Sequence, residues 1–213
     1  RSDNTFTIRD IASINLDVPY LHQCCDTPTG FDGRDACGAT SAMMILKYYG
    51  ILDSLSEDYG YYVANSYTYN GHTWNTVTND ASGDPAHGAY GYIHHNESDL
   101  TDHRAWAWRA RNFFQDHGLE STYIENPSEQ TVQDELGNSF PVYVGTEYWN
   151  GHIVVIKGYN SSGDYYIIND PWPEGTYCDD CDDIGAERHY QWENMNDEGT
   201  GPNYIVTARG TKE

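Results

Sequence analysis

One cysteine of this chain stands apart from the other four and has the position of a possible nucleophile. Cys37 is followed by Gly38 and begins a stretch with helical periodicity. The first turn of a helix has unpaired backbone N–H groups and a partial positive charge, and both favour a thiolate. The glycine leaves room for a carbonyl group, and the same N–H groups could stabilise an oxyanion. The alternative is a cysteine that merely packs behind the helix.

A cysteine nucleophile needs a base, and one of the nine histidines suits that role. His152 follows Gly151 and opens the apolar run 153–156, where a strand would hold its ring in one orientation. Most of the other histidines lie in predicted loops or on exposed helix faces. The alternative for His152 is a strand-end side chain that faces water.

Two more residues could complete a catalytic arrangement. Asp170 ends a β-branched run, and hairpin pairing could bring its carboxylate to His152, where it would orient the ring and stabilise the imidazolium. Asn169 points to the opposite face of a regular strand, so only one of the two can do this. Asp170 also precedes a proline, and a plain strand end is the alternative. Gln23, upstream of Cys37, could donate its side-chain amide to an oxyanion.

These side chains depend on elements that the residue pattern predicts. Apolar residues at helical spacing predict a helix over residues 36–50 that ends at Gly50. Capping patterns and terminal glycines predict two further helices, at 101–117 and 128–136. Strands are predicted at 16–21, 140–145, 151–158, 165–169 and 204–208. Helices followed by hairpin-connected strands are typical of an α+β fold.

The length of the chain predicts a single domain over residues 1–213. Residues 53–100 are rich in Tyr, Asn and Gly and show little periodicity. We expect them to form long loops or an insertion that binds or covers something.

The charge of the chain excludes several classes of partner. Asp and Glu number 33 against 11 Lys and Arg, for a net charge of −22. Such a surface repels nucleic-acid phosphates and anionic lipids, and no apolar run of about 18 residues could cross a membrane. We therefore expect neither nucleic acid nor membrane as a partner, and no cofactor. An acidic coat favours a monomer in an extracellular or saline setting.

The remaining cysteines form two close pairs, Cys24 with Cys25 and Cys178 with Cys181. Vicinal cysteines rarely bond to each other, so each of the first pair is expected to reach the second pair in an oxidising compartment. Free thiols and a zinc site are the alternatives, although vicinal cysteines are poorly spaced to share one tetrahedral ion. Neighbouring carboxylates leave a calcium site as a minor hypothesis. They are Asp179, Asp180, Asp182 and Asp183.

Taken in order, these motifs resemble the papain-like cysteine peptidases, and most closely the C39-like (double-glycine leader peptidase-like) branch. The resemblance is carried by Val18–Gln23, Ala36–Gly50, Gly151–Tyr159 and Tyr166–Trp172. It covers about residues 16–172, with 204–210 as a candidate last strand. It implies the papain-like α+β fold, in which an N-terminal nucleophile helix packs against a C-terminal antiparallel sheet.

The resemblance also implies roles for individual residues. Cys37 would be the nucleophile, His152 the general base and then acid, Asp170 its orienting partner and Gln23 the oxyanion donor. The implied activity is thiol-dependent hydrolysis of amide bonds through an acyl-thioester, on a peptide or protein.

Substrate contacts are expected from Gly38, Gly151 and Trp172, and the location is expected to be extracellular or at the cell surface. Two other functions stay open. One is acyl transfer or deamidation by the same three residues. The other is a non-catalytic module that binds peptide or sugar through the aromatic-rich segment 53–108.

Overall fold

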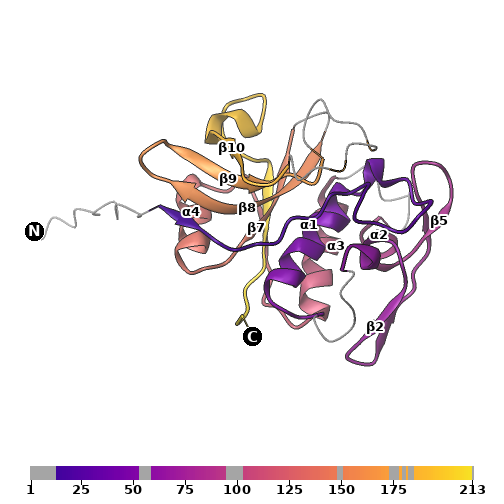
Figure 1. Cartoon of the computed structure of the whole chain (residues 1–213). Helices are drawn as coiled ribbons and strands as arrows, with labels where there is room; N and C mark the ends of the chain where they lie inside the picture. Colours follow the sequence, from indigo (N-terminus) through magenta and orange to yellow (C-terminus); the bar gives the residue numbers. More distant parts are fainter. Residues whose placement is uncertain are drawn as a thin grey trace, which may run out of the picture.

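The helices α1 (Cys37–Tyr48), α2 (Gly88–Ile93) and α3 (His103–Asp116) gather on one side of the molecule, and the large antiparallel sheet occupies the other together with α4 (Glu129–Gly137) (Figure 1). The computed structural model describes residues 13–52, 59–94, 103–147, 151–172, 178, 181 and 185–212. In this part of the chain the strand order of the large sheet is β10-β9-β8-β7-β11-β6, and β1 pairs beside β8. Its strands are β1 (Ile14–Asn15), β6 (Tyr123–Glu125), β7 (Val142–Thr146), β8 (His152–Asn160), β9 (Tyr165–Asn169), β10 (Arg188–Tyr190) and β11 (Tyr204–Thr207).

The first helix, α1 (Cys37–Tyr48), is the central element of the helical side. Ten of its twelve residues are buried, and the exceptions are Cys37 and Lys47. Small residues allow its first turns to approach β8 closely. A Cβ atom on Gly38 would lie 2.8 Å from the Tyr143 hydroxyl. The hydroxyl of Ser41 donates to the Ile153 carbonyl at 3.1 Å, which ties α1 to β8.

Short elements surround α1 on the helical side. They are η1 (Gly33–Asp35), η2 (Tyr59–Val63), the pairs β2 (Tyr67–Tyr69) with β3 (His72–Trp74) and β4 (Thr78–Asn79) with β5 (Pro85–Ala86), and the helices α2 (Gly88–Ile93) and α3 (His103–Asp116). The described residues of segment 53–100, where long loops or an insertion were predicted, therefore include short helices and two-stranded pairs. Trp74 and Tyr67 pack in the main core, so these aromatic side chains stabilise the fold and leave little exposed surface for a ligand.

Two hydrophobic cores lie on the two faces of the sheet. The larger one lies between the helical side and the sheet and includes Met43, Phe113 and Tyr143. The smaller one lies under α4 (Glu129–Gly137), which covers the other face, and η5 (Trp192–Met195) adds Met195 to it. A strand with apolar side chains on both faces must be covered on both, which explains the fully buried β7.

Most predicted elements agree with the structure in position, and one does not. The strand predicted at 16–21 does not form, since the pairing with β8 involves β1 (Ile14–Asn15) and one further hydrogen bond from the Leu16 N–H to the Lys157 carbonyl at 2.8 Å. Pro19 cannot donate to a ladder, and the chain beyond it leaves the sheet. The short strands β6 and β10 were not predicted. No helix among the described residues has the length and hydropathy to cross a membrane.

Candidate active site

A cavity of about 1030 Å³ lies between the helical side and the sheet. Its helical wall includes Cys37 at the start of α1. Its sheet wall includes Gly151 and His152, at the start of β8, and Glu147, just after β7. The cavity thus brings the predicted nucleophile and the predicted base to one place, although 115 positions separate them in the sequence.

The start of α1 leaves its backbone donors open. The residue at its N-cap is Ala36, whose side chain makes no capping hydrogen bond, and the first turn carries no acidic side chain. The first N–H groups of a helix have no partner within it. They and the positive end of the helix dipole therefore lie beside the Cys37 sulfur, where they favour negative charge.

His152 links Cys37 to a buried carboxylate. Its Nε2 atom lies 2.7 Å from Oδ1 of Asp170, and both side chains are almost fully buried. Cys37 makes a second side-chain hydrogen bond with the same ring. Because Nε2 is hydrogen-bonded to Asp170, the hydrogen bond with the Cys37 sulfur falls to Nδ1 of the ring. The strand register explains the position, because His152 begins β8 opposite Thr146 and Asp170 follows the last residue of β9.

Three donors hold the Asp170 carboxylate. Besides His152, the backbone N–H of Trp172 donates to Oδ1 at 3.0 Å, and the Tyr190 hydroxyl donates to Oδ2 at 3.1 Å. Its neighbour Asn169 faces away and donates to the Val18 carbonyl at 2.9 Å, so the alternation along β9 separates the two side chains as expected.

The surroundings of His152 favour its charged form. Burial lowers the pKa of His152. The hydrogen bonds to Asp170 and Cys37 and the charges of these two groups raise it by more, so the net pKa is about 10. An imidazolium between a carboxylate and a sulfur atom can stabilise a thiolate and can later donate a proton. The site is thus arranged for nucleophilic chemistry by sulfur.

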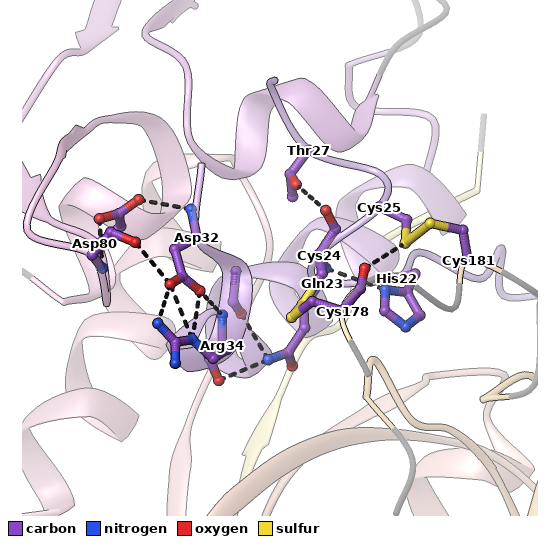
Figure 2. The surroundings of a disulfide bond; sticks show 12 residues. His22, Gln23, Cys24, Cys25, Thr27, Asp32, Arg34, Asp80, Cys178 and Cys181 are labelled. Carbon is purple, nitrogen blue, oxygen red and sulfur yellow. Dashed lines mark hydrogen bonds and ion pairs between the residues drawn. A yellow bond between two sulfur atoms is a disulfide. The ribbon is translucent and has the colours of Figure 1, made fainter. Parts of the chain in front are cut away.

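Gln23 lies near this site but directs its amide elsewhere. Its Nε2 atom donates to the carbonyls of Gly33 at 2.7 Å and Arg34 at 2.9 Å (Figure 2). Both N–H groups are therefore used, and Gln23 does not line the cavity. This geometry does not support the predicted oxyanion role. It makes Gln23 a support for the turn that precedes Cys37.

The three predicted substrate contacts have different positions. Gly151 and Trp172 line the cavity. Gly38 does not, because its Cα faces the Tyr143 hydroxyl and the Ile153 side chain in the interior. The glycine is needed there for the close packing of α1 on the sheet.

Two disulfides lie beside the site, Cys24–Cys178 and Cys25–Cys181 (Figure 2). Each vicinal cysteine reaches the second pair, as the sequence predicted, and Cys37 is the free thiol. All four paired sulfurs are bonded, which excludes the zinc alternative in this structure. The described residues contain no group of three or more metal-binding side chains, and the carboxylates of the calcium hypothesis lie outside them.

Sequence reasoning missed several residues of the site. Tyr190 lies on β10 and donates its hydroxyl to Asp170, but the residue pattern of that segment did not predict a strand. The wall residues Glu147, Asp197 and Asn203 come together through contacts between segments about 50 residues apart, which no local pattern shows.

Comparisons with known proteins agree with this fold. Residues 15–200 match the Peptidase_C39 like family. A crystal structure of a candidate C39-like peptidase from Bacillus anthracis is 14% identical, has a TM-score of 0.51, and the alignment covers 94% of this chain and 99% of that one. A fragment of prointerpain A from Prevotella intermedia is 15% identical, with a TM-score of 0.47 and coverage of 94% and 73%. No curated protein matches the chain.

The family match spans most of the chain, and the α+β architecture and the papain-like fold that the sequence predicted are confirmed. The chain belongs to the Peptidase_C39 like family.

Proposed function

We propose that this protein is a cysteine peptidase that hydrolyses peptide bonds with Cys37 as its nucleophile. One observation carries the proposal. His152 bridges the Cys37 sulfur and the buried Asp170 carboxylate, at 2.7 Å from the latter, on the wall of a cavity large enough for several peptide residues. Membership of the Peptidase_C39 like family supports the same chemistry.

The first half of the reaction forms the acyl-enzyme. The thiolate of Cys37 attacks the peptide carbonyl carbon, a C–S bond forms, and the carbonyl oxygen takes the negative charge. The open N–H groups at the start of α1 stabilise that oxyanion. The intermediate then collapses, the C–N bond breaks, and the His152 imidazolium gives its proton to the leaving amine.

The second half releases the product. Neutral His152 takes a proton from water, the resulting hydroxide attacks the thioester carbon, and the C–S bond breaks to regenerate the Cys37 thiolate. Asp170 keeps the ring oriented in both halves and stabilises the imidazolium each time it forms.

We further propose that the protein acts outside the cell on peptides or proteins, as a monomer, and without a nucleic-acid or membrane partner. The two disulfides support an oxidising location, since such bonds persist there. The acidic composition supports the absence of nucleic-acid partners.

Alkylation of Cys37 tests the proposal directly, because the other four cysteines are disulfide-bonded and unreactive. We expect iodoacetamide to modify native Cys37 faster than the same thiol in the denatured, non-reduced protein, and His152→Ala to remove that advantage. A peptide library analysed by mass spectrometry should show products that have gained one water. These products should be absent with Cys37→Ala. An alkylation rate equal to that of the denatured thiol, together with no cleaved peptide, would contradict the proposal.

A further inference from the structure

The walls of the cavity are unevenly charged. Four carboxylates line it, and one arginine does. They are Asp35, Asp80, Glu147, Asp197 and Arg34. These wall residues contribute to the charge that a bound peptide meets.

Two of the wall charges are already engaged. Arg34 forms an ion pair with Asp32, and the hydrogen bond from Arg34 holds the pKa of that carboxyl at about 2 (Figure 2). Asp80 is 6% exposed and accepts backbone N–H groups from Asp32, Ser82 and Asp84. This carboxylate organises its own loop, and Arg34 offers no free positive charge to the cavity.

Glu147 is different, because its carboxylate is held in place without being neutralised. The backbone N–H of Asp197 donates to Oε2 at 2.8 Å, and the side-chain amide of Asn203 donates to Oε1 at 3.2 Å. Neither donor is a cation. Glu147 follows Thr146, the register partner of His152, and it lines the same cavity as Cys37 and His152.

Two further carboxylates line the same cavity. Asp35 precedes Cys37 by two residues on the helical wall, and Asp197 lies on the sheet wall. Among the described residues no ion pair joins Asp197 or Glu147 to a Lys or Arg, and Asp35 has only a longer-range attraction to Arg34. Negative charge therefore remains on both walls of the cavity.

The rest of the lining suits a long side chain with a charged tip. Tyr204, Ile153 and Trp106 also line the cavity and contribute apolar surface to it. The hydrocarbon stem of lysine or arginine packs on such a surface while its charge reaches a carboxylate.

Building on the proposed peptidase function, we infer that the cavity selects peptides with Lys or Arg next to the scissile bond, and that the carboxylate of Glu147 is the main determinant. Asp197 and Asp35 add to the same preference. A cation about 6 Å from one fixed carboxylate in a partly solvated cleft gains roughly tenfold in affinity. Added salt should weaken the preference, because the cleft is open to solvent.

The test uses peptides that differ only at the residues flanking the cleaved bond, which carry Lys, its uncharged analogue acetyl-lysine, or Glu. For the wild-type protein we expect kcat/KM to be about tenfold higher with Lys than with acetyl-lysine, and lowest with Glu. Glu147→Gln should reduce the Lys to acetyl-lysine ratio several-fold. Glu198→Gln is the matched control, because Glu198 is exposed, adjacent to Asp197 and absent from the cavity lining. It should leave that ratio unchanged.

A binding measurement separates this inference from the proposed activity. The Cys37→Ala protein should bind the Lys peptide more tightly than the acetyl-lysine peptide in a fluorescence anisotropy titration, whether or not the wild-type protein cleaves either. Cleavage with equal rates for the two peptides would overturn the inference and leave the peptidase intact. Tighter binding of the Lys peptide without any cleavage by the wild-type protein would support the inference and overturn the peptidase. If Glu147→Gln and Glu198→Gln reduced the Lys to acetyl-lysine ratio of kcat/KM equally, the assignment to Glu147 would be overturned.

Discussion

Replacing Asp170 with Asn tests whether this carboxylate holds His152 in its charged form. The substitution keeps the size of the side chain, and its carbonyl oxygen can still accept from Nε2 of His152 at the position now 2.7 Å away. What it removes is the negative charge. A hydrogen bond to a charged group contributes about 1.5–3 kcal/mol and a neutral one about 1 kcal/mol. The difference is about 0.5–2 kcal/mol, so at about 1.4 kcal/mol per pKa unit the pKa of His152 should fall from about 10 by roughly 0.4–1.4 units.

The assay is an NMR titration of the His152 ring in protein labelled on histidine. Cys37→Ala serves as the companion variant, since the sulfur also raises this pKa, and the midpoint should fall in each single variant and furthest in the double variant. Circular dichroism shows whether each variant is folded. A folded Asp170→Asn protein with the wild-type midpoint would refute the reasoning, because the raised pKa would then owe nothing to the carboxylate.

Three more predictions concern stability and positioning. The pKa of buried His117 is lowered to about 4, since burial disfavours its charge, so the unfolded chain gains a proton first as the pH falls from 6.5 to 4. The free energy of unfolding should fall by about 3 kcal/mol over that range, and urea titrations of His117→Phe should lack this part of the slope. The two disulfides close nearly the same loop, so the double variant Cys25→Ser with Cys181→Ser should lose only about 2 kcal/mol, whereas reduction of both bonds should cost about 5 kcal/mol. If loss of one disulfide lowered the free energy of unfolding by half as much as reduction of both, the two bonds would act independently and the prediction would be refuted. Tyr190→Phe should lower kcat several-fold with little change in KM and move the titration midpoint of His152, because the hydroxyl holds the Asp170 carboxylate. An unchanged midpoint would make its role purely structural.

The parts of the fold that could be predicted are those with a local signal. The helix that begins at Cys37 has apolar residues at helical spacing, and the strand that begins at His152 is a continuous β-branched run. Asp170 could be placed beside His152 because consecutive antiparallel strands pair as hairpins.

What could not be predicted depends on contacts between distant segments. Strand β10 has three residues, Arg188–Tyr190, none of them buried, and nothing in the alternation marks it as part of a sheet. Its contribution through Tyr190 is therefore invisible in the sequence. The same holds for Gln23, whose type suits an oxyanion donor but whose amide is used by two carbonyls ten and eleven positions away.

The buried aromatic residues of segment 53–100 illustrate a different difficulty. Tyr and Trp are amphipathic, so their presence does not distinguish an interior from a binding surface. Trp74 stacks on His117 with ring centroids 4.3 Å apart, and this contact joins the β2–β3 pair to the end of α3. Composition suggested loops there, whereas packing against α3 orders the chain.

The open start of α1 has a consequence for anyone who wishes to make this protein more robust. Asp or Ser in place of Ala36 would typically raise the free energy of unfolding by about 1 kcal/mol. The added oxygen would occupy the amides that a reacting carbonyl needs, and Asp would also place like charge beside the sulfur. At this one position a more stable helix start and the proposed oxyanion site therefore exclude each other.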